Sequence, residues 1–199
     1  MITASAIKLL ILTGARRSEV AAMQWNELDL KTCTWVLPSE RTINGQAHMI
    51  YLSDLAIKII NQLRLITGCS NFVFDTGYYE KSGHIHPDTL TGAIAKLRGA
   101  YTGTKKKIIV DSPISSIKPF SNHELRRTAA TAWGEYLKTD PHVIERMLNH
   151  QPLNKLVSIY QRAVYADEQR DTWLKWGNLL KEVCYERIDK ENEKYRYLV

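Results

Sequence analysis

The hydrophobic pattern of this chain changes its period once, and this change constrains the fold more than any other feature. Apolar residues recur at helical spacing along most of the sequence, but between residues 33 and 52 they alternate with a period of two, which is typical of strands. The strands are expected at 34–37 and 48–52. They flank Asn44-Gly45, a dipeptide favoured in type I′ hairpin turns. We therefore expect one small antiparallel sheet in a chain that is otherwise helical.

Helical patterns with apolar stripes account for most of the remaining sequence. Gly14 ends the first of them, as a glycine just beyond a helix commonly does. A short strand is expected at 71–74, whereas 75–87 and 99–120 are expected to be irregular. The predicted fold class is α+β, mainly helical, with a small antiparallel β-sheet. The expected helices cover residues 2–12, 16–25, 54–64, 88–97, 122–138, 141–148 and 166–183.

Length and composition predict an ordinary globular protein. The 199 residues are enough for one hydrophobic core, and 44% hydrophobic with 24% charged residues excludes a disordered chain, a fibrous repeat and a coiled coil. The longest apolar stretch, at residues 6–12, is too short to span a bilayer, so we expect a soluble, cytoplasmic protein with no membrane partner. Three widely spaced cysteines favour reduced thiols. The net charge of +6 favours a polyanionic partner only weakly.

Several residues are candidates for chemistry, although each is ambiguous alone. His123 and Arg126 are three residues apart at the start of a predicted helix, where free amides and the helix dipole favour an anion. The same pair is also typical of an exposed basic helix start. Arg16 follows a glycine turn and His150 ends a predicted helix, and both positions are common for structural residues. Tyr160 is one of ten tyrosines, most of which are expected in the core.

The order and spacing of these residues are more informative than any one of them. The motifs Thr-Gly-x-Arg-x-x-Glu at 13–19, His-x-Leu-Arg at 123–126, Leu-x-His at 148–150 and Ile-Tyr at 159–160 resemble those of the tyrosine recombinases, or phage integrases. The resemblance covers essentially the whole chain as the catalytic domain of that family. Further matches are similar to prophage and genomic-island integrases of the phage P4 type; they lie at 38–41, 51–53, 142–146 and 160–162.

The resemblance implies a role for each matching residue. Arg16 and Arg126 would bind the non-bridging oxygens of one DNA phosphate, and Glu19 would orient the region of Arg16. His123 would contact that phosphate and help to take the proton of the nucleophile Tyr160. His150 would be a second histidine donor. The implied catalytic set is Arg16, His123, Arg126, His150 and Tyr160.

This set suits phosphoryl transfer without a metal or another cofactor. Attack of a phenol oxygen on phosphorus builds negative charge on the equatorial oxygens, which fixed guanidinium and imidazole groups stabilise in place of Mg²⁺. The product would be a 3′-phosphotyrosyl DNA with a free 5′-hydroxyl. Because the phosphodiester energy is conserved, a 5′-hydroxyl can reverse the step and rejoin DNA without ATP. We therefore expect no cofactor and no metal.

One position departs from the family pattern. Members usually carry a lysine in the β-hairpin that protonates the leaving 5′-oxygen, and here Ile43 occupies the expected position. Arg41 lies two residues earlier on the same strand face and is a possible contact of the leaving oxygen, but a guanidinium is a poor proton donor. Lys81 or the run Lys105, Lys106 and Lys107 are alternative donors. We hypothesise reduced cleavage unless the leaving group is activated otherwise.

Alternatives remain open for the function and for three groups of residues. Type IB topoisomerases use the same residue types, and a DNA-binding remnant that no longer cuts would explain Ile43. Tyr165 competes with Tyr160 as the nucleophile, or else packs beside the last helix. The run Lys105, Lys106 and Lys107 is either solvated or bound to the DNA backbone. His84-x-His86 is expected to be a surface pair rather than a metal site.

Domain organisation and partners follow from the resemblance. Residues 1–184 are expected to form the catalytic domain and 185–199 a charged tail, with the core-binding and arm-binding domains of the family absent. The expected partner is double-stranded DNA carrying attachment sites. The complete protein is expected to be a homo-tetramer on DNA, assisted by accessory DNA-bending or directionality proteins, and the isolated domain a monomer. The last helix and tail either dock on a neighbouring subunit or pack on their own domain.

Overall fold

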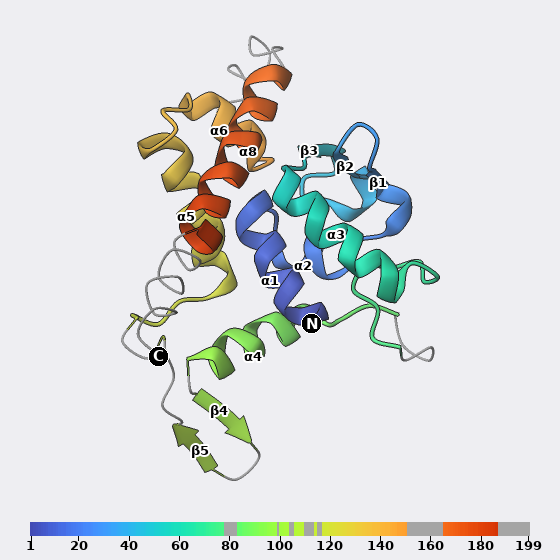
Figure 1. Cartoon of the computed structure of the whole chain (residues 1–199), viewed down its shortest axis with the longest axis vertical. Coiled ribbons are helices and arrows are strands. Elements are labelled where there is room, and N and C mark those ends of the chain that lie inside the picture. The colour runs from blue at the N-terminus through green and yellow to red at the C-terminus, as the bar shows by residue number, and fades with distance from the viewer. Residues whose placement is uncertain are drawn as a thin grey trace, which may run out of the picture.

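Helix α1 runs through the middle of the molecule and contacts most of the other helices (Figure 1). The computed structural model describes residues 1–77, 83–98, 100–103, 106–109, 114, 117–150 and 165–186. On one side of α1 lie α5, α6 and α8, and on the other lie the main sheet and α3 (Figure 1). The helices are α1 (Ile2–Thr13), α2 (Arg17–Ala21), α3 (Asp54–Thr67), α4 (Pro87–Leu97), α5 (Asn122–Glu135), α6 (Pro141–Met147) and α8 (Ala166–Lys181). The predicted mainly helical α+β class is confirmed.

The predicted antiparallel sheet is present, but its turn differs from the prediction. Strands β1 (Leu28–Asp29), β2 (Thr34–Leu37) and β3 (His48–Tyr51) pair in that order, and β1 was not predicted. The connection from β2 to β3 is not a two-residue type I′ turn at Asn44-Gly45. It spans residues 38–47, because Pro38 and the 3₁₀ turn Ser39–Arg41 interrupt the ladder after Leu37. Gly45 has a φ of 66° within this longer loop.

The helix expected at 16–25 is shorter than predicted. Helix α2 ends at Ala21, and the chain then pairs with the segment after α3. The N–H of Val73 donates to the carbonyl of Met23 at 2.9 Å, and the N–H of Trp25 donates to the carbonyl of Asn71 at 3.0 Å. These bonds to a distant segment replace the next helical turn. The strand expected at 71–74 is reduced to an isolated bridge between Gln24 and Phe72.

A second hairpin lies in the region predicted to be irregular. Strands β4 (Ala100–Gly103) and β5 (Lys106–Ile109) pair antiparallel and extend beyond α4 at the lower end of the view (Figure 1). Their register places Thr102 opposite Lys107, so the strands lack the alternation of apolar and polar residues by which a half-buried strand is recognised. Helix α5 also ends at Glu135 instead of Lys138, which has a φ of 56°.

Helix α8 packs against the end of α1 within the same chain. The indole N–H of Trp173 donates to the carbonyl of Thr13 at 3.0 Å, and that of Trp176 donates to the carbonyl of Ile11 at 2.8 Å. These donors satisfy carbonyls that a helix end leaves without intrahelical partners. Gly14 follows in the left-handed conformation, and a Cβ there would lie 2.5 Å from the Trp133 ring. The end of α1 is therefore fixed by the helices packed on it.

Two expectations from the sequence, reduced cysteines and the lack of a membrane-spanning helix, can be compared with the described residues. Cys33, Cys69 and Cys184 are free thiols. None of the described helices combines the length and the apolar character needed to cross a bilayer.

Candidate active site

The turn between α1 and α2 presents Arg16 on a fixed backbone. Arg16 is the N-cap residue of α2, and its N–H donates to Oε2 of Glu19 at 2.7 Å. Its Nη1 donates to Oε1 of the same carboxylate at 3.0 Å. Because the Glu19 side chain is only 3% exposed, it holds both the backbone and the guanidinium of Arg16 from inside the protein. Glu19 thus makes the contact expected of a residue that orients Arg16.

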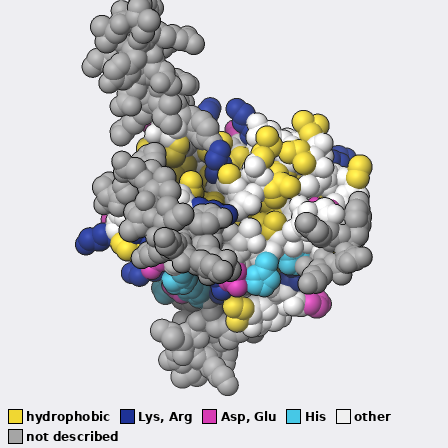
Figure 2. All heavy atoms as spheres, turned by 90° about the horizontal axis from the view of Figure 1, so that it is seen from below, with side chains coloured by type: hydrophobic (Ala, Val, Ile, Leu, Met, Phe, Trp, Pro, Cys, Tyr) yellow, Lys and Arg dark blue, Asp and Glu magenta, His cyan; other side chains and the backbone are white. Residues whose placement is uncertain are grey.

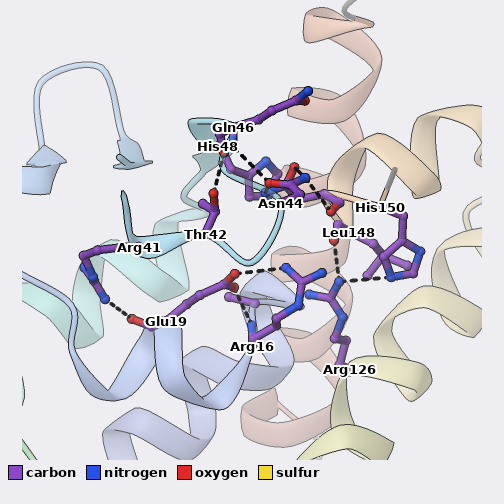
Figure 3. A network of polar contacts seen from close by, with 12 residues as sticks. Arg16, Glu19, Arg41, Thr42, Asn44, Gln46, His48, Arg126, Leu148 and His150 are labelled. Carbon is purple, nitrogen blue, oxygen red and sulfur yellow. Dashed lines mark hydrogen bonds and ion pairs between the residues drawn. The ribbon is translucent and has the colours of Figure 1, made fainter. Parts of the chain in front are cut away.

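Arg126 joins three segments of the site from its position on α5. Its Nη1 donates to the carbonyl of Gly14, two residues before Arg16. Its Nη2 donates to the carbonyl of Leu148 and lies 3.3 Å from Nε2 of His150 (Figure 3). Arg126 is only 6% exposed. The structure therefore brings Arg16, Arg126 and His150 together, although 110 residues separate the two arginines.

The two guanidinium groups are close enough to influence each other. Burial, together with the positive charge of Arg16, lowers the pKa of Arg126 to about 10. The carboxylates of Glu19 and Glu145 act in the opposite direction. Arg126 remains protonated near pH 7, so the site keeps two neighbouring positive charges. An anion placed between them would relieve this repulsion.

The end of α6 positions His150. Asn149 has a φ of 49°, and its N–H donates to the carbonyl of Arg146 at 2.9 Å. The N–H of His150 donates to the carbonyl of Glu145 at 3.0 Å. These two bonds form a Schellman motif, which turns the chain back over the last helical turn. Nδ1 of His150 consequently lies 2.8 Å from Oε2 of Glu145, a contact that was not predicted.

The loop between β2 and β3 reaches the same place through a pair of amides. Nδ2 of Asn44 donates to Oδ1 of Asn149 at 2.7 Å, and Nδ2 of Asn149 donates to Oδ1 of Asn44 at 3.3 Å. The loop passes beside Arg16 (Figure 3). Ile43, at the position expected for the family lysine, is 79% exposed in this loop. The hairpin is therefore tied to the segment that carries His150, while Ile43 projects from it.

Arg41 is held away from this cluster. Its Nη1 forms an ion pair with Glu27, and its Nη2 donates to the carbonyl of Glu19 at 2.8 Å (Figure 3). Both terminal nitrogens thus contact groups of the domain itself. This placement favours a structural role, in which Arg41 fixes the backbone of α2, over the predicted contact with the leaving oxygen.

His48 belongs to the site, although no motif marked it. It lies on β3 with its ring 8% exposed, and its Nε2 is 3.1 Å from the carbonyl of Met147. Burial lowers the pKa of His48 to about 4, and the charges of Arg126 and Arg16 contribute in the same direction. A neutral ring at neutral pH therefore donates through Nε2 to the last residue of α6. In the sequence, the contact of His48 with α6 is indicated only by the position of His48 on the inward face of a strand.

Among the remaining predicted residues, the structure describes His123, Tyr165 and part of the lysine run. His123 is exposed in the first turn of α5, one turn before Arg126. Tyr165 is the N-cap of α8, has a φ of 50° and packs partly buried against the core, as expected of a packing residue. Tyr160, Lys81 and Lys105 lie outside the described residues. Lys106 and Lys107 are described only as part of β5.

The two loop histidines have local structural roles. The ring of His84 packs against Phe72 with centroids 4.9 Å apart. Nδ1 of His86 accepts the N–H of Asp88 and caps α4. Within the ranges that the structure describes, no group of His, Cys, Asp and Glu side chains is arranged to hold a metal ion.

Basic side chains elsewhere do not form a continuous stripe on the face seen from below. Figure 2 shows the described lysines and arginines scattered among hydrophobic and uncharged side chains on this face.

A helical domain that gathers two arginines and a histidine in this way has the groups of a phosphate-binding enzyme. The model of the phage integrase family matches residues 1–167. The chain is 27% identical over 171 residues to the prophage integrase IntA of Escherichia coli K12, covering 86% of this chain and 37% of that protein. It is also 27% identical over 193 residues to the integrase of Enterobacteria phage P4, covering 90% and 40% respectively.

The same family is found among solved structures. The integrase from mycobacterium phage Brujita has the same fold, with a TM-score of 0.62 and 20% identity, covering 86% of this chain and 50% of that chain. The chain belongs to the phage integrase family, the tyrosine recombinases, as the sequence motifs predicted. It spans less than half the length of the two curated relatives.

Proposed function

We propose that this chain is the catalytic part of a site-specific DNA recombinase that cuts and rejoins DNA through a 3′-phosphotyrosyl intermediate, with Tyr160 as the nucleophile. The observation that carries the proposal is the meeting of Arg16 and Arg126, both held by contacts inside the domain, next to His150. Two guanidinium groups can bind the non-bridging oxygens of one phosphate. Membership of the phage integrase family supports this use of the site.

Each step of the proposed reaction uses groups of the chain. The phenol oxygen of Tyr160 attacks phosphorus and the bond from phosphorus to the 5′-oxygen breaks. The 5′-oxygen takes up a proton, for which Lys81 or the run Lys105, Lys106 and Lys107 is the candidate donor. Arg16, Arg126 and His150 stabilise the charge on the equatorial oxygens, and His123 accepts the tyrosine proton. The reverse step, with a 5′-hydroxyl of another strand, rejoins the DNA. The reaction integrates or excises a prophage or another mobile element.

The wider assignments belong to the same proposal. Residues 1–184 form the catalytic domain and 185–199 a charged tail. The partner is double-stranded DNA with attachment sites, on which four copies of the complete protein assemble, with DNA-bending or directionality proteins as accessories. The isolated domain is a monomer. Its place of action is the bacterial cytoplasm, where this DNA lies.

A nicked suicide DNA that carries the attachment site tests the proposal. The full-length protein should form a covalent adduct on this DNA, detected by its shift in a denaturing gel. Tyr160→Phe should abolish the adduct, and the matched variant Tyr165→Phe should retain it. Loss of the adduct in Tyr165→Phe alone would move the nucleophile to Tyr165. Absence of any adduct with the unaltered protein would reject a cutting enzyme.

A second candidate, a DNA-binding remnant without cleavage activity, is favoured by Ile43. This residue is exposed in the hairpin loop at the position of the family lysine and has no group to donate a proton. If general acid catalysis limits the reaction, Ile43→Lys should raise the rate of adduct formation on ordinary DNA. DNA in which a sulfur atom replaces the leaving 5′-oxygen needs little protonation and should remove the difference. An adduct that appears only with Ile43→Lys would identify the native chain as the remnant.

A further inference from the structure

Glu145 makes the contact that fixes the orientation of the His150 ring. Its Oε2 lies 2.8 Å from Nδ1 of His150, and on the other side of the ring Nε2 lies 3.3 Å from Nη2 of Arg126. An ionised carboxylate only accepts hydrogen bonds, so Nδ1 must carry the proton. Nε2 is then available to accept from Arg126. The ring thus has a defined tautomer between an acidic and a basic partner.

The backbone makes this contact a built feature of the fold. Glu145 and His150 are five residues apart, a spacing that does not place two side chains together on a continuous helix. They meet because the Schellman motif at Asn149 turns His150 back, so that its N–H donates to the carbonyl of Glu145 at 3.0 Å. Glu145 therefore holds His150 through both its backbone and its side chain.

The charge of Glu145 also reaches the neighbouring arginine. Its carboxylate raises the pKa of Arg126, against the effects of burial and of Arg16. Glu145 is thus the second acid of the site, beside Glu19, and it acts from the opposite end of the cluster. Its own side chain is 58% exposed and that of His150 is 41% exposed, and exposed ion pairs contribute little to the stability of a fold.

We propose that Glu145 is a positioning residue for His150, which turns Nε2 toward the bound phosphate and holds the ring in place while Nε2 donates there. This inference rests on the proposed function. For Nε2 to donate to a phosphate oxygen, the ring must take up a proton from solvent. This change also releases the N–H of Arg126 that Nε2 accepts in the free protein. One proton taken up by His150 therefore gives the phosphate two donors.

Three variants of the full-length protein separate orientation from charge. Glu145→Ala removes both, and Glu145→Gln keeps an acceptor oxygen but removes the charge. The matched control is Asp171→Asn, because Asp171 forms an exposed ion pair with Lys175 at 2.7 Å on α8, with a side chain 57% exposed. Urea unfolding midpoints should be the same for all variants, since both ion pairs are exposed.

The first measurement is the tautomer of His150, read from long-range ¹H–¹⁵N spectra and assigned with His150→Gln. At pH 8 the unaltered protein, Glu145→Gln and Asp171→Asn should carry the proton on Nδ1. Glu145→Ala should lose this preference. An unchanged tautomer in Glu145→Ala would overturn the proposal, even if adduct formation fell, because Glu145 would then act in another way.

The second measurement is the rate of adduct formation on the suicide DNA between pH 6 and pH 9. Glu145→Ala should be slower by about 10-fold or more, as is typical when a partner that orients a functional histidine is removed. Glu145→Gln keeps an acceptor for Nδ1 but loses the charge, so its rate should lie between those of the unaltered protein and of Glu145→Ala. Asp171→Asn should match the unaltered protein throughout.

The two proposals fail in different ways. If the unaltered protein forms no adduct, the proposed function fails and the tautomer alone decides the role of Glu145. If the unaltered protein forms the adduct and Glu145→Ala reacts within twofold of its rate at every pH, the inference about Glu145 fails and the proposed function stands.

Discussion

His48 shows how strongly the site acts on a single residue. Its ring is buried beside two arginines, and burial is the first cause of the fall of its pKa to about 4. The carboxylate of Glu19 and the Met147 carbonyl oppose this fall without cancelling it. In the unfolded chain the pKa of a histidine is about 6.5. The folded protein consequently binds fewer protons than the unfolded chain between these two pH values.

This difference predicts a pH-dependent loss of stability. As pH falls from 6.5 toward 4, His48 becomes protonated in the unfolded chain but stays neutral in the folded protein. The free energy of unfolding therefore falls. The part of this loss that is due to His48 is about 2 kcal/mol between pH 7 and pH 5. Urea unfolding of the unaltered protein and of His48→Gln should show that the variant loses about 2 kcal/mol less over this interval. An equal loss in both would show that His48 is not the group responsible.

The sequence identified part of this site and missed the rest for physical reasons. Arg16, Arg126 and His150 stand in motifs whose order and spacing are recognisable without a structure. The contact of Glu145 with His150 depends on the left-handed backbone of Asn149, although an asparagine after a helix is a known signal for that turn. His48 lies on a strand like any inward residue, and only the packing of β3 on α6 gives it a partner.

At the scale of elements, the amide pair between Asn44 and Asn149 ties the β2–β3 loop to the end of α6. Asn149→Gly is a clean test, because glycine adopts the left-handed conformation without strain and preserves the Schellman motif. The variant should leave α6 intact and loosen the loop, which keeps the bond from Asn44 Nδ2 to the backbone carbonyl of residue 149, 3.2 Å long in the unaltered protein. Hydrogen exchange measured by mass spectrometry should rise several-fold at residues 42–46 and stay unchanged at the C-terminal turn of α6.

Asn44→Ala provides the matched change from the other side of the pair. It should raise exchange in the same loop by more than Asn149→Gly does, because it also removes the bond from Asn44 Nδ2 to the carbonyl of Asn149 at 3.2 Å and the bond from the N–H of Gln46 to Asn44 Oδ1 at 3.1 Å. The double variant should add little to Asn44→Ala, because the amide pair is already lost in that variant. Unchanged exchange at 42–46 in Asn149→Gly would mean that the loop is held by its own contacts, such as the hydrogen bond from Thr42 Oγ1 to the carbonyl of Gln46 at 2.9 Å.

Two helical glycines distinguish packing from helix propensity. A Cβ on Gly177 of α8 would lie 2.2 Å from the side chain of Ser53 at the start of α3, whereas a Cβ on Gly92 of α4 would meet nothing within 4 Å. Gly177→Ala should lower the free energy of unfolding by about 1–3 kcal/mol through overpacking. Gly92→Ala should raise it by about 0.5–1 kcal/mol. Denaturant unfolding measures both, and a stabilised Gly177→Ala would contradict close packing of α8 on α3.

The elements that the sequence missed are those whose partners lie far along the chain. The end of α2 is set by hydrogen bonds from the segment at 71–73, which no local pattern indicates. The hairpin β4–β5 is joined by backbone pairing, and β5 places two lysines before two isoleucines, so it carries no alternating hydrophobic period. By contrast, α1, α3 and α4 were recognised because their apolar stripes face the core along several turns.

At the scale of the whole molecule, the end of α1 connects the core to the site. Carbonyls at this end accept hydrogen bonds from Trp176, Trp173 and Arg126, which belong to α8 and α5. Arg16 follows directly on the same turn. The position of Arg16 therefore depends on α5 and α8, which come much later in the sequence. One of them, α5, also carries Arg126.

The distribution of charge over the molecule predicts which lysines hold DNA. Lys106 and Lys107 begin β5, and Lys105 precedes them in the sequence. The β4–β5 hairpin extends from the body of the protein at the end opposite to α8 (Figure 1). Each lysine that contacts a phosphate releases a counterion, which adds about 0.9 to the slope of log affinity against log salt. Changing all three to Gln should therefore lower that slope by up to about 3.

The matched control removes the same charge elsewhere, from Lys138, Lys175 and Lys181 near α5 and α8. Fluorescence anisotropy with duplex DNA at several salt concentrations should show a shallower slope for the hairpin variant only, equally for attachment-site and unrelated DNA, because phosphate contacts do not read sequence. Both variants halve the net charge of +6, so any effect of overall charge is the same in each. Equal slopes in the two variants would show that the hairpin lysines attract DNA only at long range and do not contact its backbone.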